Sequence, residues 1–303
     1  MTDYLRFIPD LKDKIIDIVS ILDVEQNWGL SYIDINDAWS HTKGKDVTVA
    51  VIDTGWFPHK DLIGNFKEGY DATGNNDYLD HGNYHSSHVS GVIAANSGPD
   101  SVGVTGIAPE SKLTIIKSLD DSGCGSYDFI YNALKIAHDL NVDVINMSLG
   151  SPVNPGNENI HSIIKDIAGQ GKIIVTAAGN DGGNVGYPAK YDEVVAVAAI
   201  DKNGNLAKFS SRGPELDAAA PGVQIYSTWG DNTYIKLDGT SMACPAIAGM
   251  IALIVSWMKT ENQQKEINYK QMIKLLQQLG GDSLINMGSY NIAVPKFCNY
   301  TWK

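Results

Sequence analysis

The sequence predicts an α/β fold with a doubly wound, mostly parallel sheet that is flanked by helices on both faces. Three observations lead to this prediction: several apolar runs have the length of strands, these runs are continuously apolar, and helix-length segments lie between some of them. A strand that is covered on both faces carries apolar residues at successive positions rather than at alternate ones. Strands and helices in alternation are typical of a parallel sheet between two helical layers.

The predicted strands are the segments 47–52, 113–118, 142–149, 172–178 and 194–200. Helices are predicted at 126–140 and 158–170, and a buried helix at the longest apolar run, 246–255. That run is about half the length that a membrane span needs. Because no internal repeat or low-complexity linker interrupts the chain, we expect one domain over residues 25–303. Residues 1–24 form a separate N-terminal extension.

Composition excludes some classes of partner. The chain has 303 residues, 43% of them apolar, and a net charge of −12 with no block of basic residues. Nucleic acid and anionic membranes are therefore not expected as partners. Three widely spaced cysteines, Cys124, Cys244 and Cys298, argue against a disulfide framework and favour a reducing compartment. The start, MTDYLRFIPDLKDK, lacks the apolar segment of a signal peptide, which predicts a cytoplasmic protein, or a secreted one whose leader was removed earlier.

Polar residues and glycines follow three of the predicted strands. These are Asp53-Thr54-Gly55, Ser148-Leu149-Gly150 and Gly179-Asn180-Asp181-Gly182. In open α/β sheets, catalytic groups collect beyond the carboxyl ends of the strands. Any one of these segments alone is equally typical of an ordinary turn.

Four residues together supply what acyl transfer requires. A serine hydroxyl, here Ser241, becomes a good nucleophile when an imidazole, here His85, takes its proton. The imidazole needs a carboxylate such as Asp53 to fix its tautomer and stabilise its cation. The oxyanion of the tetrahedral intermediate needs donors, which the Asn180 amide and the backbone N–H of Ser241 would provide.

The segment DGTSMACPAIAG (238–249) explains why the serine lies among small residues. Gly239 and Thr240 allow a tight turn, and a serine that opens a helix has a free N–H at the positive end of the helix dipole. We expect Pro245 to lie in the first helical turn, where a missing N–H has no cost.

Four segments resemble the signature segments of the subtilisin-like serine proteases: VAVIDTG (49–55), HSSHVSG (85–91), AAGND (177–181) and DGTSMACP (238–245). They occur in the order of that family, and the resemblance covers roughly residues 25–280. It implies a serine endopeptidase with an acyl-enzyme intermediate, in which Asp53 orients His85, His85 is the general base, Ser241 is the nucleophile and Asn180 is the oxyanion donor. Ser86 and Ser87 replace the Gly and Thr that are usual in the family.

The resemblance also implies how substrates are bound. Two segments would pair with the backbone of an extended peptide, which gives broad specificity. They are Gly123, Cys124 and Gly125, and Ser148, Leu149 and Gly150. Ala178 and Gly179 would wall the primary pocket and Gly186 would form its floor, so that it accepts a large apolar or aromatic residue. Asp181 near the mouth would instead admit a basic residue. Tyr127 either borders a second, more distant pocket or packs on the core.

A structural calcium ion is a further implication of the resemblance. The ligands would be Gln26, Asp61, Asp100, Val102 and Val104. Carboxylate, amide and backbone carbonyl oxygens are the ligands that calcium prefers. A plain surface loop is the alternative interpretation.

The N-terminal extension is closest in character to the short extension of the intracellular subtilisins. Phe7, Ile8 and Pro9 match part of a motif that, in that group, lies back across the active site. The resemblance therefore implies an inhibitory segment whose proline prevents cleavage, and it suggests a homodimer. A solvent-exposed leader is the alternative.

Three other functions are alternatives to this one. Asp53-Thr54-Gly55 is also typical of aspartic proteases, but these need a second carboxylate. His81, His85 and His88 have spacings that resemble helical zinc sites, but no glutamate lies between them. The replacement of Gly and Thr by Ser86 and Ser87 motivates a third alternative, a weak or inactive protease fold that serves as a binding or regulatory module.

Overall fold

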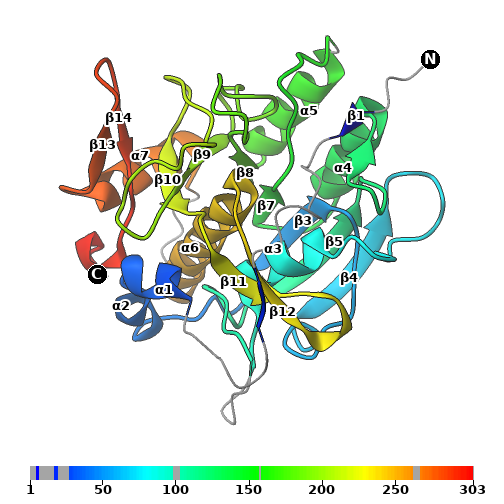
Figure 1. Cartoon of the computed structure of the whole chain (residues 1–303), viewed down its shortest axis with the longest axis horizontal. Coiled ribbons are helices and arrows are strands. Elements are labelled where there is room, and N and C mark those ends of the chain that lie inside the picture. Colours follow the sequence, from blue (N-terminus) through cyan, green and yellow to red (C-terminus); the bar gives the residue numbers. More distant parts are fainter. Residues whose placement is uncertain are drawn as a thin grey trace.

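The computed structural model describes residues 5–6, 17–19, 27–97, 103–156, 158–261 and 267–302. Nine of the described strands form one sheet, in the order β13-β14-β10-β9-β8-β7-β3-β5-β4 (Figure 1). Every neighbouring pair in it is parallel except β13 and β14 at one edge. The strands are β3 (Thr48–Asp53), β4 (Phe66–Asp71), β5 (Lys112–Lys117), β7 (Val144–Met147), β8 (Ile173–Ala177), β9 (Val195–Ile200), β10 (Ala218–Pro221), β13 (Leu284–Asn286) and β14 (Asn291–Ala293).

The winding direction of this sheet reverses between β3 and β7. From β3 the chain passes to β4 and β5 on one side, and then to β7, β8, β9 and β10 on the other. In doubly wound sheets such a reversal opens a crevice at the carboxyl ends of the two strands. The residues that follow these strands, from Asp53 and from Ser148, are therefore placed where a site is expected.

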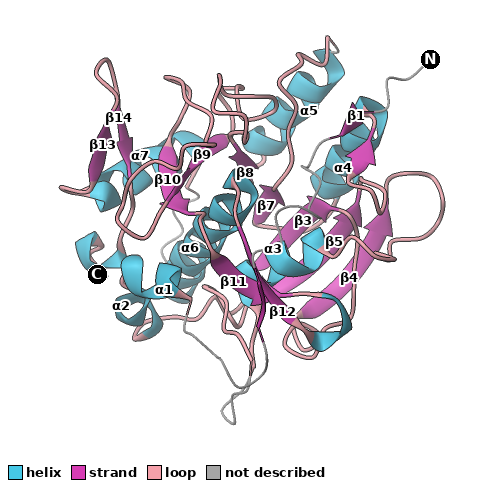
Figure 2. Ribbon diagram, viewed as in Figure 1, coloured by secondary structure: helices cyan, strands magenta, loops and turns pink. Residues whose placement is uncertain are grey.

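Helices cover both faces of the sheet, as Figure 2 shows. The helices are α1 (Trp28–Tyr32), α2 (Ile35–Trp39), α3 (His85–Ala94), α4 (Tyr127–Asp139), α5 (Glu158–Gly169), α6 (Thr240–Thr260) and α7 (Tyr269–Gly280), with short 3₁₀ turns at Gly230–Asn232 and Phe297–Asn299. Successive residues of β3 enter different cores: Val49 and Val51 belong to the cluster with α3 and α6, and Ala50 and Ile52 to the cluster with α4 and α5. This explains why its sequence is continuously apolar.

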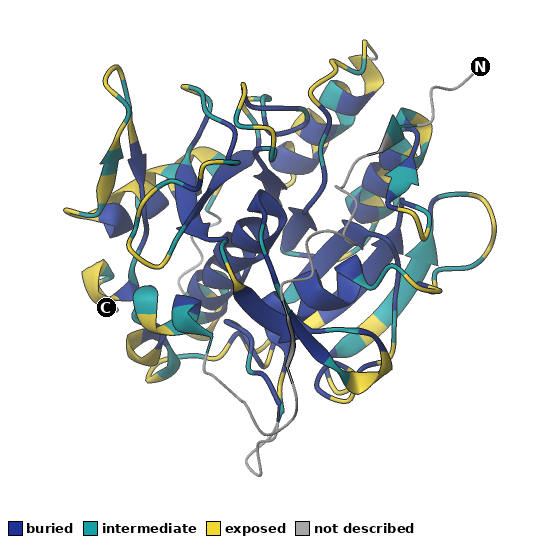
Figure 3. Ribbon diagram, in the orientation of Figure 1, coloured by how far each residue is buried: buried dark blue, intermediate teal, exposed yellow. Residues whose placement is uncertain are grey.

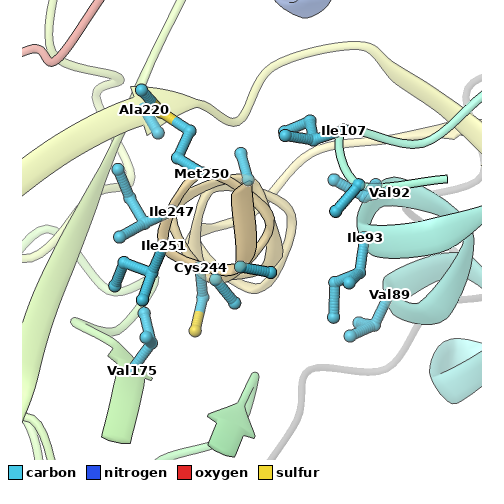
Figure 4. Close-up of a cluster of buried hydrophobic side chains, with 14 of the residues drawn as sticks. Val89, Val92, Ile93, Ile107, Val175, Ala220, Cys244, Ile247, Met250 and Ile251 are labelled. Carbon is cyan, nitrogen blue, oxygen red and sulfur yellow. The ribbon is translucent and has the colours of Figure 1, made fainter. Parts of the chain in front are cut away.

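Helix α6 is the central element of the larger core. Its surroundings include Val89 and Val92 from α3, Val175 from β8 and Ala220 from β10 (Figure 4). The helix has 21 residues and is apolar enough to cross a membrane by length and composition, but 83% of its apolar window is buried inside the protein. Figure 3 shows it enclosed by other elements, as expected for a core helix.

Two short pairings attach the N-terminal extension to the rest of the protein. Strand β1 (Leu5–Arg6) pairs antiparallel with β6 (Cys124–Gly125). Strand β2 (Asp17–Val19) pairs antiparallel with β12 (Tyr234–Leu237), which also pairs with β11 (Ile225–Thr228), giving a three-stranded sheet in the order β11-β12-β2. The extension thus contacts two separate segments of the protein.

The predicted strands and helices are confirmed, each with boundaries within a few residues of those expected. One detail was wrong. Pro245 is the sixth residue of α6, which begins at Thr240, and so it lies beyond the first turn. Its missing N–H therefore removes a hydrogen bond that the helix would otherwise make.

Candidate active site

Asp53 and His85 form a buried pair at the carboxyl end of β3. Asp53 is the last residue of the strand, His85 is the first residue of α3, and the two are 0% and 1% exposed. His85 Nδ1 lies 2.8 Å from Asp53 Oδ1 and 3.0 Å from Oδ2. Because a carboxylate only accepts, Nδ1 carries the proton and Nε2 is left as an acceptor.

The turn that precedes His85 is held by a second buried carboxylate, that of Asp80. Its oxygens accept the backbone N–H groups of residues 82–84 and the hydroxyl of Thr54. The same hydroxyl accepts the N–H of Ser86 at a distance of 3.2 Å, which ties the end of β3 to the first turn of α3. Burial raises the pKa of Asp80, opposed by these hydrogen bonds. Tyr84 takes a left-handed conformation with φ of 62°, which turns the chain into the helix.

Ser241 is the second residue of α6 and is 4% exposed. Its hydroxyl donates to the backbone carbonyl of Ser148 at 3.0 Å, and the Ser148 hydroxyl donates to the carbonyl of Ser241, also at 3.0 Å. Ser148 directly follows β7, which is hydrogen-bonded to β3. Within the described residues no hydrogen bond joins the Ser241 hydroxyl to His85, so rotation of the Ser241 side chain would be needed for proton transfer.

Asn180 and the first turn of α6 lie together beside Gly239. Asn180 Oδ1 accepts from the N–H and the hydroxyl of Thr240, at 2.8 and 3.0 Å. A Cβ atom at Gly239 would lie 3.7 Å from Asn180 Nδ2 and 3.5 Å from the backbone nitrogen of Ser241. Both nitrogens therefore border the space that the missing side chain leaves free. Both nitrogens are candidate donors to an oxygen placed there, and the sulfur of Met242, also 3.5 Å from that position, is the third neighbour.

The two segments predicted to form the primary pocket, 178–179 and Gly186, lie together, and Ser151 lies beside them. The N–H of Gly186 donates to Ala178 at 3.0 Å, and Ser151 and Tyr187 exchange backbone hydrogen bonds of 2.9 and 2.8 Å. A Cβ atom at Gly186 would lie 2.8 Å from the carbonyl oxygen of Ser151, so a side chain does not fit there. Gly179 has φ of +117°, which favours glycine.

Two further predicted residues of the substrate site have specific partners. The Tyr127 hydroxyl donates to the carbonyl of Val153 at 2.6 Å, and its ring packs against the core cluster of α4 and α5. Its role at a second, more distant pocket stays a prediction. The Asp181 carboxylate accepts from Gly183 and Ser211, at 2.9 Å each, and the hydrogen bond from Gly183 is the main cause that lowers its pKa.

The predicted calcium ligands are only partly described: Gln26, Asp100 and Val102 lie outside the described residues. The remaining carboxylate, Asp61, is buried, and its Oδ2 accepts the N–H of Val104 at 2.9 Å and the hydroxyl of Tyr234 at 2.8 Å. Its Oδ1 lies 3.0 Å from the ammonium of Lys60. No group of three or more His, Cys, Asp or Glu that could hold a metal occurs in the described part of the chain. Both carboxylate oxygens of Asp61 are therefore engaged by protein donors.

The histidines weighed as zinc ligands do not converge. His81 pairs with Asp77 at 2.7 Å, His85 pairs with Asp53, and His88 Nε2 donates to the carbonyl of Ile225 at 2.9 Å. Burial, with a smaller contribution from His85, lowers the pKa of His88 to about 3. His88 is therefore neutral and structural.

Some residues of the site were missed by the sequence analysis. They are Asp80, which braces the His85 turn; Lys117, whose ammonium donates to the Thr54 carbonyl and to Asp121; and Asn146, whose amide donates to the Ser148 hydroxyl at 2.9 Å. Lys117 and Asn146 are polar residues within buried strands, which is the signal that could have pointed to them, whereas Asp80 lies between exposed residues and has no such signal.

The chain matches the model of the subtilase family over residues 44–279. It therefore belongs to the subtilase family and is a subtilisin-like serine endopeptidase. It is 44% identical to subtilisin DY of Bacillus licheniformis over 222 residues, which cover 71% of this chain and 78% of the relative. It is 38% identical to a thermostable alkaline protease of Halalkalibacterium halodurans over 268 residues, covering 86% and 72%, and 37% identical to thermitase of Thermoactinomyces vulgaris over 233 residues, covering 76% and 82%.

Proposed function

We propose that this endopeptidase hydrolyses peptide bonds through Asp53, His85 and Ser241, by way of an acyl-enzyme intermediate. The observation that carries the proposal is the buried Asp53–His85 pair, in which Nδ1 donates to the carboxylate. In the neutral imidazole this arrangement places the acceptor at Nε2, as a general base requires.

In the proposed reaction, His85 Nε2 takes the proton of Ser241 as its oxygen attacks the substrate carbonyl carbon. The oxyanion of the tetrahedral intermediate accepts from Asn180 Nδ2 and from the N–H of Ser241, both of which border the space beside Gly239. The imidazolium, stabilised by Asp53, then gives its proton to the departing amine. A water molecule then attacks the acyl-enzyme in the same way, with His85 as the general base, and the carboxylic acid product is released from Ser241.

Mass spectrometry after treatment with a fluorophosphonate tests this proposal. We expect one adduct, on Ser241, and its rate of formation should fall by orders of magnitude in His85→Ala. Asp77→Asn is the matched control, because Asp77 lies in the loop before His85 and pairs with His81 rather than with the site. An adduct on another residue, or none on the folded protein, would contradict the proposal and favour a binding module.

We propose further that the primary pocket prefers apolar or aromatic residues. The support is that Gly186 carries no side chain and that the Asp181 carboxylate is engaged by Gly183 and Ser211. Peptide substrates with Phe, Ala or Lys before the scissile bond should rank in that order in kcat/KM. A preference for Lys would assign Asp181 to the pocket instead.

The N-terminal extension is proposed to inhibit the enzyme by occupying the place of a substrate strand. Its support is the antiparallel pairing of Leu5 with Gly125 and of Arg6 with Cys124, since 123–125 is a segment predicted to bind substrate. Phe7, Ile8 and Pro9, the predicted inhibitory residues, lie outside the described residues. Strand addition supplies backbone hydrogen bonds regardless of sequence, so a segment of the chain itself competes with any peptide.

Two truncated variants test this inhibition. A chain that begins at Asp17 keeps β2, and one that begins at Glu25 removes the whole extension of residues 1–24; we expect both to cleave a small peptide substrate at least tenfold faster than the full chain. A synthetic peptide of residues 1–24 should inhibit them, whereas a scrambled peptide should not. Equal activity of the three chains would overturn the inhibitory role.

Calcium remains a prediction of the resemblance, and no step of the proposed reaction depends on it. Thermal unfolding in the presence of calcium and of a chelator measures its role. A higher midpoint in calcium would support the site. An unchanged midpoint would agree with the satisfaction of Asp61 by Lys60, Tyr234 and Val104.

A reducing compartment is proposed on the three cysteines, which are all free thiols. Fractionation of cells that produce the protein, followed by detection with an antibody, distinguishes cytoplasmic from secreted protein. Proteins or peptides are the proposed substrates; the homodimer, and the absence of nucleic-acid and membrane partners, remain predictions from the sequence.

A further inference from the structure

Pro245 leaves the backbone carbonyl of Ser241 without its helical partner. In α6, the carbonyl of residue 241 would accept from the N–H of residue 245, four positions later. Proline has no N–H, and its ring crowds the carbonyl four residues before it. The orphaned carbonyl belongs to the residue proposed as the nucleophile, and it lies in a part of the protein that is almost inaccessible to water.

The hydroxyl of Ser148 takes the place of the missing helical donor. Ser148 Oγ lies 3.0 Å from the Ser241 carbonyl oxygen and accepts from Asn146 Nδ2 at 2.9 Å. The Cys244 thiol lies 3.2 Å from Asn146 Oδ1, and burial raises the pKa of that thiol, so it remains a protonated donor. Cys244, Asn146 and Ser148 are each 0% exposed, and no water competes for these bonds.

We propose that the Ser148 side chain is a positioning residue for Ser241, replacing the helical hydrogen bond that Pro245 abolishes. The proposal rests on the assignment of Ser241 as the nucleophile. Because Asn146 orients the Ser148 hydroxyl, the carbonyl of Ser241 is fixed from the neighbouring strand β7. That fixes the first turn of α6, and with it both the hydroxyl of Ser241 and its N–H beside Asn180.

The alternative is that the network serves stability alone. In that case, its loss would lower the midpoint of unfolding and the fraction of active molecules, but each correctly folded molecule would turn over at the normal rate. Positioning is different, because a displaced nucleophile slows the chemical step in every molecule. The measurement that separates the two is kcat per site, with sites counted by fluorophosphonate titration.

The first test is Ser148→Ala, which removes the hydroxyl and keeps the backbone that is predicted to bind substrate. We expect kcat per titrated site to fall about ten- to a hundredfold, with KM for a small peptide substrate changed by no more than about twofold. Ser148→Cys, which keeps a weak donor, should fall between wild type and Ser148→Ala. It also serves as the working variant if Ser148→Ala does not fold.

The sharper test is rescue by Pro245→Ala. This substitution gives residue 245 an N–H that can donate to the Ser241 carbonyl, as in any uninterrupted helix. Alone, it should leave kcat within about twofold of wild type. Combined with Ser148→Ala, it should recover most of the lost kcat, so the two substitutions should be strongly non-additive in a double-mutant cycle.

Additive effects in the double-mutant cycle, or an unchanged kcat per site in both Ser148 variants, would overturn the positioning role. Absence of any adduct on Ser241 in the wild-type protein would instead overturn the proposed catalytic function itself. The two failures are therefore distinguishable in the same set of experiments.

Discussion

The two halves of the site differ in how complete they are without substrate. In the histidine half, Asp53 and His85 are fully buried and already hydrogen-bonded to each other. In the serine half, the Ser241 hydroxyl donates to the Ser148 carbonyl. There, Asn180 Nδ2 has no hydrogen-bond acceptor among the described residues. The proposed acid–base pair is thus already hydrogen-bonded without substrate, whereas the proposed nucleophile and oxyanion donors are not yet joined to it.

The difference follows from what each half does. The histidine pair must keep one tautomer through the whole cycle, and a buried carboxylate with fixed donors ensures this at no cost during reaction. In the proposed mechanism, the serine half must stabilise a substrate oxygen that becomes negatively charged only in the intermediate, so its donors have to be left for that oxygen. Substitutions in the two halves test this division.

The largest expected effect is the loss of the nucleophile. Ser241→Ala should reduce kcat about a millionfold, a magnitude carried over from a subtilisin. Ser87→Ala is the matched control: Ser87 is a buried serine in α3 whose hydroxyl has no partner among the described residues, and activity should stay within about twofold. The measurement is the initial rate of peptide hydrolysis. Appreciable turnover by Ser241→Ala would mean that the serine half is not the reacting half.

The next largest effect tests whether the Asp53 carboxylate is needed to orient the imidazole of His85. Asp53→Asn keeps the shape, but the N–H of Thr54 holds the remaining oxygen and the new NH₂ group faces His85 Nδ1. That favours the wrong tautomer, and kcat should fall about ten-thousandfold. The rate of acylation by a fluorophosphonate should fall in parallel. A loss of less than tenfold would show that the carboxylate is not needed to orient the imidazole.

A smaller effect is expected from an oxyanion donor. Asn180→Ala should lower kcat about a hundred- to a thousandfold with little change in KM, a range also carried over from a subtilisin. Asn205→Ala, on an exposed turn, is the control and should behave as wild type. If KM rose and kcat stayed constant, Asn180 would bind the substrate in its ground state rather than the oxyanion.

The smallest effect concerns stability in the histidine half. Burial holds the pKa of His88 at about 3, against 6.5 in the unfolded chain, so between these pH values only the unfolded state binds the proton. This contribution to stability is complete above pH 6.5 and is lost progressively as the pH falls towards 3. At pH 5 the loss amounts to about 2 kcal/mol of the free energy of unfolding.

Denaturant unfolding at pH 8 and pH 5 measures this contribution, in a Ser241→Ala background that prevents self-digestion. His88→Gln should remove about 2 kcal/mol of the difference in stability between the two pH values. If the background protein and His88→Gln lost the same stability on acidification, another group would be responsible.

Much of the fold could be predicted because the apolar pattern that indicates each central strand lies within the strand itself. The central strands β3, β7, β8 and β9 are buried on both faces, and their continuous apolar runs follow directly from that. Strand β4 was missed because it lies at an edge of the sheet and its sequence, FKEGYD, is half-buried and largely polar. Strand β10 was also missed, because its four residues, AAAP, are too few to show the periodicity of a strand.

The residue types of the site could be predicted, but their connections could not. Asp53 follows a strand and His85 begins a helix, which a sequence can indicate. The contacts Thr54–Asp80 and Ser148–Ser241 join residues 26 and 93 positions apart, and only the packed sheet and helices bring them together. The wrong placement of Pro245 has the same cause, because the start of α6 depends on the bond between Thr240 and Asn180.

Strand β2 has a consequence for how the extension can be removed. It covers the outer edge of β12, the strand that leads through Asp238 and Gly239 into α6. Cleavage before residue 17 would release β1 from β6 and would leave β2 paired with the edge of β12. Cleavage after residue 19 would leave a bare row of backbone donors and acceptors, which attracts strands from other molecules. The position of the cut therefore decides whether activation also makes the enzyme prone to self-association.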